Sequence, residues 1–113
     1  MKEFADKTAV ITGGASGIGF ALAQLCVERR MNIVLADIEK EALASATQHF
    51  EDGQANVFSL KTDVSSKKSV EALFDQATSR FGKIHLLFNN AGVVNGGSPP
   101  PIWNLPREDW DWV

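Results

Sequence analysis

The chain has 113 residues, enough for one small domain, and a formal net charge of −3 with acidic and basic residues interspersed, so no nucleic-acid or membrane partner is indicated. No apolar run approaches the roughly 18–20 residues of a membrane span, and the N-terminus lacks the apolar stretch of a signal peptide. The single cysteine excludes an internal disulfide framework, which is typical of a cytoplasmic protein.

The first third of the chain predicts a strand, a helix and a second strand. Thr8–Thr12 is a short β-branched and apolar run, as expected for a strand that is buried on both faces. From Ile18 onward, apolar residues recur at helical spacing, which predicts a helix ending near Arg30. Asn32–Ala36 is again a continuous apolar run and predicts the second strand.

The same alternation continues to residue 88. A helix is predicted from Ile38 to a C-terminal cap at Gly53, a strand over 56–61, a helix that Gly82 closes, and a strand over Lys83–Phe88. Strands and helices that alternate with short joints are typical of a parallel α/β sheet with right-handed crossovers.

The segment Val10–Gly19, VITGGASGIG, places four glycines directly behind the first strand. In this context Gly13 suits a tight turn, Gly17 lets a phosphate approach the helix N-terminus, and Gly19 lets the helix pack closely on the sheet. The N–H groups and the dipole of the helix would then face the pyrophosphate of a dinucleotide. A glycine-rich turn without a ligand is the alternative interpretation.

Two other nucleotide loops do not fit this segment. A P-loop requires Lys and then Ser or Thr after its last glycine, whereas Phe20 follows Gly19. A methyltransferase-type loop usually has an acid at the end of the first strand, where this chain has Thr12.

Asp37 stands at the end of the second predicted strand. A carboxylate there can accept hydrogen bonds from both hydroxyls of the adenosine ribose. It would repel a 2′-phosphate, by up to about 4 kcal/mol at about 4 Å and an effective dielectric of about 20. Because no basic residue stands at Ser16 or Ile38, NAD is predicted over NADP. Alternatively, Asp37 caps the following helix, and both roles can coexist.

These residues resemble the short-chain dehydrogenase/reductase family. TGGASGIG at Thr12–Gly19 is similar to the family's TGxxxGIG motif, and NNAG at Asn89–Gly92 to its second hallmark. Asp63 and Val64 match the family's Asp-Val pair after the third strand, and REDWDW near the end resembles the start of its fourth helix. His85 is a departure, because the family often has Asp there.

The resemblance implies a Rossmann-type doubly wound sheet with strand order 3-2-1-4 and a set of cofactor contacts along it. The implied cofactor-binding residues are Gly13, Ser16, Gly17, Ile18 and Gly19 at the pyrophosphate, Asp37 and Ile38 at the adenosine, Asp63 and Val64 at the adenine, and Asn90, Ala91 and Gly92 beside the second ribose.

Several of these polar residues also have structural interpretations. Asp63 or Ser65 could be the N-cap of the third helix, and Asn89 and Asn90 could satisfy backbone groups at a strand end.

The remaining reactive side chains are expected to be structural. Cys26 falls on the apolar stripe of the first helix, and neither His49 nor His85 has a visible nucleophile or carboxylate partner. We expect no metal site.

In this family a tyrosine acts as acid and base, a lysine lowers its pKa, and a serine positions the substrate oxygen. The chain contains no tyrosine, so no catalytic residue is predicted here. We expect residues 1–113 to be a single partial domain, truncated as the fourth helix begins. The complete protein would be an NAD-dependent enzyme that interconverts an alcohol and a carbonyl, and a homo-oligomer. A non-catalytic nucleotide-binding or partner-binding module is the alternative.

Two features are expected to follow from the truncation. The fourth strand would become an open apolar edge, and three tryptophans (Trp103, Trp110 and Trp112) crowd the last residues with little chain to bury them. The loop over residues 93–106 is expected to flank the active-site cleft of the complete fold.

Overall fold

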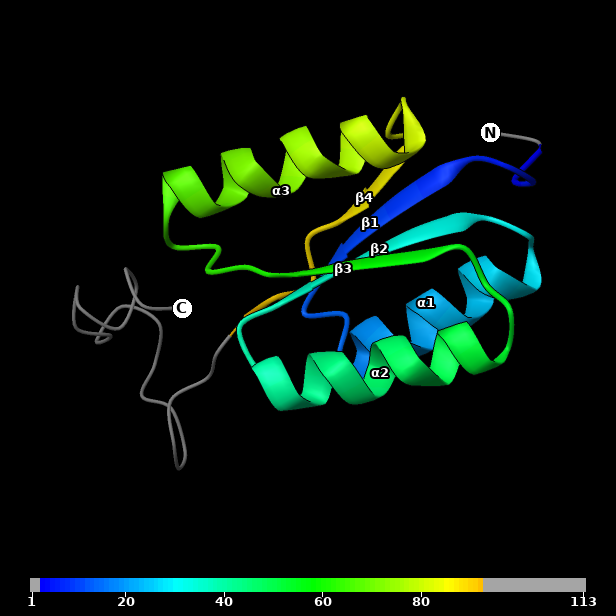
Figure 1. Ribbon diagram of the computed structural model, residues 1–113, viewed down its shortest axis with the longest axis horizontal. Helices are drawn as coiled ribbons and strands as arrows, with labels where there is room; N and C mark the ends of the chain where they lie inside the picture. Colours follow the sequence, from blue (N-terminus) through cyan, green and yellow to red (C-terminus); the bar gives the residue numbers. More distant parts are fainter. Residues whose placement is uncertain (1–2, 93–113) are drawn as a thin grey trace, which may run out of the picture.

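The computed structural model describes residues 3–92, in which strands and helices alternate along the chain (Figure 1). The elements are β1 (Thr8–Thr12), α1 (Gly17–Glu28), β2 (Asn32–Asp37), α2 (Lys40–Asp52), β3 (Val57–Lys61), α3 (Lys67–Phe81) and β4 (Leu86–Phe88). The four strands form one parallel sheet in the order β3-β2-β1-β4, which confirms the predicted fold class and strand order.

The sheet separates two hydrophobic clusters. Helices α1 and α2 cover one face and α3 covers the other (Figure 1). In β2, Ile33 and Leu35 belong to the cluster under α1 and α2, while Val34 and Ala36 belong to the cluster under α3. Since successive side chains of a strand point to opposite faces, a strand covered on both faces must be apolar throughout.

The helix boundaries differ slightly from the predicted ones. α1 ends at Glu28, and Arg30 takes a left-handed φ of 61°. α2 begins at Lys40 and not at Ile38, because the Asp37 carboxylate accepts the N–H of Glu39 (3.1 Å) and holds the chain in a turn.

The two predicted glycine caps are observed in different forms. Gly53 is the C-cap of α2, but its φ is −82°, and the left-handed residue is Gln54 with φ 63°. Gly82 closes α3 with φ 84°, as expected where a helix ends in a left-handed residue.

The fourth strand is shorter than predicted: it begins at Leu86 and not at Lys83. His85 explains the difference, because its backbone N–H donates to the Thr8 carbonyl (2.9 Å) while its ring Nδ1 accepts the Thr8 N–H (3.0 Å). The His85 ring therefore accepts the Thr8 N–H of β1, which a backbone carbonyl of the neighbouring strand would otherwise accept. His85 has the structural role predicted for it.

The predicted fourth helix, the three tryptophans and the loop over 93–106 lie outside the described residues. In residues 3–92 no helix is both long and apolar enough to cross a membrane.

Candidate functional site

The glycine-rich segment forms a tight turn between β1 and α1, next to the residues that follow β4. Gly13 has φ +67°, and a Cβ at this position would lie 2.9 Å from Asn90 Nδ2 and 3.1 Å from Ala91 Cα. Both its conformation and its neighbours therefore require glycine, as the sequence predicted.

Gly19 also requires the absence of a side chain. A Cβ on Gly19 would lie 2.0 Å from the carbonyl oxygen of Gly13 and 2.7 Å from Asn90 Nδ2. The first turn of α1 thus packs closely on the glycine turn and on Asn90.

Gly17 differs from both, because a Cβ there would meet no protein atom within 4 Å. Its φ is +58°, and the residue is exposed. A cavity of about 380 Å³ opens beside this turn, lined by residues of the turn and of α2: Ala15, Ser16, Gly17, Phe20, Ala42, Ser45, Ala46 and His49. The space at Gly17 is therefore open to a ligand.

The N-terminus of α1 presents backbone N–H groups to this space. Its N-cap, Ser16, has an extended backbone and makes no side-chain capping bond, and the first turn carries no acidic residue. By contrast, the Ser66 side chain at the start of α3 accepts the N–H of Ser69. Because the first N–H groups of a helix lack intrahelical acceptors, the start of α1 is suited to an anion.

Asp37 lies at the end of β2, against the glycine turn. Its Oδ2 accepts the N–H of Ala15 and its Oδ1 accepts the N–H of Glu39, both at 3.1 Å. Asp37 is thus not the N-cap residue of α2, which is Glu39. A carboxylate has about four acceptor positions, so two remain for ribose hydroxyls after these two bonds.

Sequence reasoning missed the role of Thr12, whose hydroxyl joins β1 to the segment after β4. Its Oγ1 donates to the carbonyl of Phe88 (3.3 Å) and accepts the N–H groups of Asn90 (3.1 Å) and Ala91 (3.0 Å). Asn90 adds a bond from its side-chain amide to the Gly13 carbonyl (3.3 Å). The sequence offered one signal for this role, because Thr12 is a polar residue at the end of a strand that is buried throughout.

Replacing Thr12 by Val is expected to lower the free energy of unfolding by roughly 1–3 kcal/mol, because the Ala91 N–H loses its acceptor and the Asn90 N–H keeps only the Phe88 carbonyl (2.9 Å). Thr12→Ser keeps the hydroxyl and serves as the control, with a smaller loss. Urea denaturation followed by circular dichroism measures both. Equal stabilities of the two variants would contradict a role for the hydroxyl.

The segment after β3 is ordered by its own polar side chains. Asp63 Oδ1 accepts the hydroxyl (2.6 Å) and the N–H (3.0 Å) of Ser65, and these bonds lower the pKa of the exposed Asp63 carboxyl. The N-cap of α3 is Ser66, and neither Asp63 nor Ser65. Asp63 therefore shapes the turn at this end of the sheet, where the resemblance puts the adenine.

The predicted site residues follow four neighbouring strands and so lie along one edge of the sheet, the carboxyl edge. The turn at 13–19 follows β1, Asp37 ends β2 and Ile38 follows it, Asp63 and Val64 follow β3, and 90–92 follow β4. Three apolar side chains at this edge are exposed: Ile18 (73%), Ile38 (53%) and Val64 (50%). Such an edge can hold an extended ligand with apolar and anionic parts.

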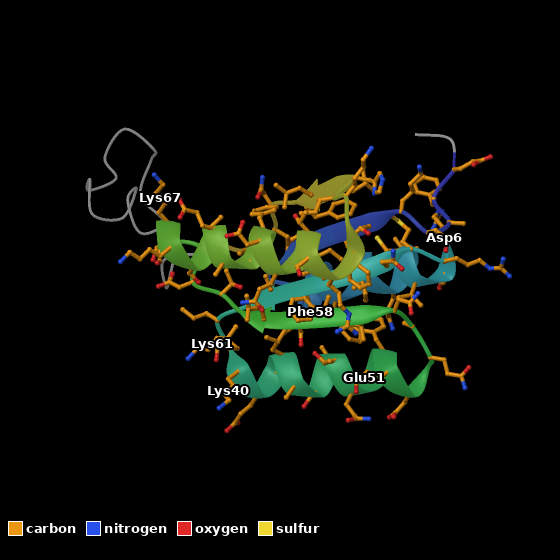
Figure 2. All side chains as sticks on the ribbon, turned by 45° about the horizontal axis from the view of Figure 1, so that its top comes forward. Asp6, Lys40, Glu51, Phe58, Lys61 and Lys67 are labelled. Carbon is orange, nitrogen blue, oxygen red and sulfur yellow. The ribbon has the colours of Figure 1, made fainter. Side chains whose placement is uncertain are left out.

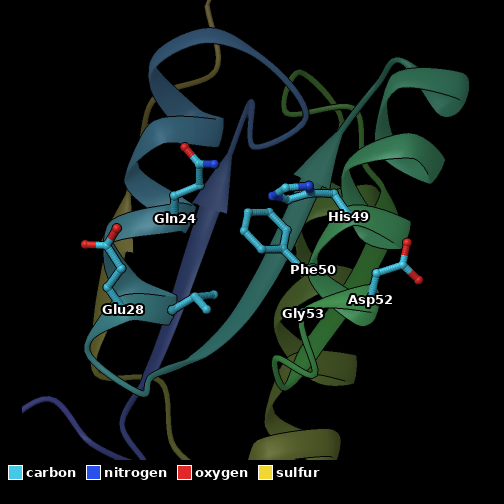
Figure 3. A pocket seen from close by; sticks show the side chains of 7 residues that line it. Gln24, Glu28, His49, Phe50, Asp52 and Gly53 are labelled. Atoms are coloured by element: carbon cyan, nitrogen blue, oxygen red, sulfur yellow. The ribbon is translucent and has the colours of Figure 1, made fainter.

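The other reactive side chains considered in the sequence, Cys26 and His49, pack against neighbouring side chains, and His49 also lines the cavity beside Gly17. Burial raises the pKa of the Cys26 thiol, with a smaller opposite effect of Arg29, which agrees with a packing role. His49 packs between Phe20 and Phe50, with ring centroids 5.3 and 5.1 Å away. A second cavity, of about 470 Å³, lies between α1 and α2 near Gln24, Glu28 and Asp52 (Figure 3).

The strand order agrees with the comparisons to known proteins. The sequence profile of short chain dehydrogenases matches residues 7–113. The chain therefore belongs to the short-chain dehydrogenase/reductase family of oxidoreductases.

Individual relatives include enzymes with either nicotinamide cofactor. A short-chain dehydrogenase/reductase from Burkholderia phymatum, solved with NAD, is 46% identical, with a TM-score of 0.88 over 100% of this chain and 39% of its own. L-Sorbose reductase from Gluconobacter frateurii, solved with NADPH and L-sorbose, is 32% identical, with a TM-score of 0.85 over 97% of this chain and 41% of its own.

A characterised relative gives the same picture of partial coverage. The CLA biosynthesis dehydrogenase/reductase of Lactiplantibacillus plantarum is 41% identical over 113 residues, which are 100% of this chain and 38% of that protein. The chain thus spans about two fifths of the length of such relatives.

Proposed function

We propose that residues 1–113 form the cofactor-binding portion of an NAD-dependent oxidoreductase that interconverts an alcohol and a carbonyl. The single observation that carries this proposal is the open, uncapped N-terminus of α1 at Gly17, with the Asp37 carboxylate fixed beside it. The family membership and the Burkholderia phymatum structure with NAD support the same function.

The residues present fit a dinucleotide. The N–H groups at the start of α1 would hold the pyrophosphate, and Asp37 would accept the hydroxyls of the adenosine ribose through its two remaining acceptor positions. Ile38 and Val64 would contact the adenine with apolar surface that is exposed in this structure. When bound, the nicotinamide supplies or accepts a hydride.

The segment after β4 would support the other half of the cofactor. The Thr12 hydroxyl and the Asn90 amide hold this segment against the glycine turn, so that its backbone is in place before the cofactor arrives. Asn90, Ala91 and Gly92 would then run beside the second ribose. These contacts position the cofactor and transfer no proton.

The charge of Asp37 is the basis for preferring NAD. A 2′-phosphate on the adenosine ribose would lie beside this carboxylate, and two like charges at hydrogen-bonding distance repel each other. The two backbone N–H groups that Asp37 accepts keep the carboxylate in place, so that it cannot easily turn away from the phosphate.

The protein, produced as its gene encodes it, is expected to use NAD better than NADP by at least about tenfold in kcat/KM, or roughly 1.4 kcal/mol. Asp37→Asn should narrow this preference, because it removes the charge and keeps the size of the side chain. Calorimetric titration with NAD and NADP gives the ratio of the two dissociation constants and so tests the preference in binding alone. Equal or better use of NADP by the unaltered protein would overturn the assignment of Asp37.

The predicted cytoplasmic location, the homo-oligomer and the alcohol or carbonyl substrate stay predictions about the complete protein.

A further inference from the structure

We infer that Lys61 is a specificity-determining residue of the adenosine site, and that its ammonium group weakens the discrimination of Asp37 against a 2′-phosphate. The inference rests on the proposed function, since it concerns the ribose that Asp37 would bind. Lys61 is the last residue of β3.

Strand pairing places Lys61 beside Asp37. In the parallel pair of β2 and β3, Asp37 and Lys61 are direct partners. Neighbouring strands lie about 4.8 Å apart, so the two side chains start from adjacent points at the carboxyl edge. Local sequence patterns direct attention to basic residues at the glycine turn and directly after β2, and Lys61 stands at neither position.

Both side chains project from the same face of the sheet. Ile33 and Leu35 of β2 face α1 and α2, so Asp37, two residues further, lies on that face as well. In β3, Ser59 bonds to Thr47 of α2 (2.8 Å), which puts Ser59 and hence Lys61 on this face. The Lys61 ammonium is therefore on the side of the sheet where Asp37 accepts the N–H of Ala15.

The positive charge of Lys61 is available to a ligand. The residue is exposed, and within residues 3–92 the single ion pair closer than 4.0 Å is Lys67 with Glu71, so no acid holds Lys61 at that distance. Figure 2 shows Lys61 at the same end of the molecule as Lys40, the first residue of α2. This end of the molecule thus carries cations from two elements, β3 and α2.

This arrangement has a consequence for cofactor choice. A phosphate at the ribose 2′ position is repelled by Asp37 and attracted by Lys61. A 2′-hydroxyl carries no charge, so Lys61 hardly changes its binding. Removing Lys61 should therefore strengthen the preference for the unphosphorylated ribose. Lys61 is exposed, so solvent limits the size of the effect.

The test compares the affinities of two probes, 5′-AMP and adenosine 2′,5′-bisphosphate, which differ only in the 2′-phosphate. Calorimetry at low salt on the protein as its gene encodes it gives the ratio of their dissociation constants. Lys61→Met is expected to shift this ratio against the bisphosphate roughly two- to fivefold, and Lys61→Glu further. Added salt should shrink both shifts.

Lys83→Glu is the matched control, because Lys83 is also exposed but precedes β4 at the opposite, amino edge of the sheet. It should leave the ratio unchanged. A ratio that is unchanged in both Lys61 variants, or a shift as large in Lys83→Glu, would overturn the role of Lys61. So would a shift seen with Lys40→Met and not with Lys61→Met.

Failure of the proposed function would give a different binding result from failure of the role of Lys61. If the unaltered protein bound neither probe, the adenosine site itself would be wrong, and the role of Lys61 with it. Binding of 5′-AMP with an unchanged ratio in the variants would leave the adenosine site intact and refute only the role of Lys61.

Discussion

Gly17→Val is expected to abolish measurable NAD binding while the protein stays folded. The new side chain would meet no protein atom, because a Cβ at Gly17 has nothing within 4 Å. It would instead fill the space in front of the α1 N-terminus, where the pyrophosphate must approach the backbone N–H groups. We expect the affinity for NAD to fall at least about a hundredfold, or roughly 2.7 kcal/mol.

Gly82→Val is the matched control for backbone strain. Gly17 and Gly82 both have a left-handed φ, +58° and +84°, and a Cβ at either meets no atom within 4 Å. Each valine should therefore destabilise the fold by at least about 1–2 kcal/mol, and the one at residue 82 by more, because the ψ of −94° at Gly82 lies outside the left-handed helical region. Only the valine at residue 17 should affect calorimetric titration with NAD. Unchanged affinity in a folded Gly17→Val protein would mean that the turn does not hold phosphate.

The chain of residues 1–113 by itself is expected to show no hydride transfer. It has no tyrosine, so it lacks the acid and base that the family uses. General acid–base catalysis contributes about 10²–10⁴-fold, and positioning of the substrate contributes more, so the loss of both should leave no turnover. The test follows the absorbance of reduced nicotinamide with a panel of alcohols and ketones, and the protein as its gene encodes it is the comparison.

The same preparation tests the edge of the sheet. β4 ends the sheet of the described residues, and its Leu87 is 43% exposed. An edge strand with apolar side chains can pair with another chain, so light scattering should detect association of this chain. Robust turnover, or a stable monomer, would show that residues 1–113 are complete in themselves.

Local sequence patterns were enough to predict the order and type of the elements. Buried strands such as Thr8–Thr12 consist of apolar and β-branched residues, and this pattern depends little on distant residues. The start of α2 and the length of β4 could not be predicted in the same way. Both depend on side chains that replace backbone partners: the Asp37 carboxylate at Glu39 and the His85 ring at Thr8.

In the candidate site, too, some features follow from local sequence and others depend on contacts between distant residues. The strained glycine Gly13 and the open position at Gly17 could be assigned from their spacing alone, because a turn between a strand and a helix is a local structure. The contacts of Thr12 with the segment after β4, and the pairing of Lys61 with Asp37, join residues from different strands. They could be found only once the strand order and register were known.

The central place of β1 also has a consequence for the order of folding. Side chains of β1 and β2 meet across 24 residues of chain, whereas Thr12 meets Ala91 across 79. Closing the longer loop costs about 1 kcal/mol more in chain entropy. During synthesis β1, β2 and β3 can pair with each other before β4 has left the ribosome. The segment held by Thr12 is therefore expected to join the sheet last, so that the two halves of the cofactor site form at different stages of folding.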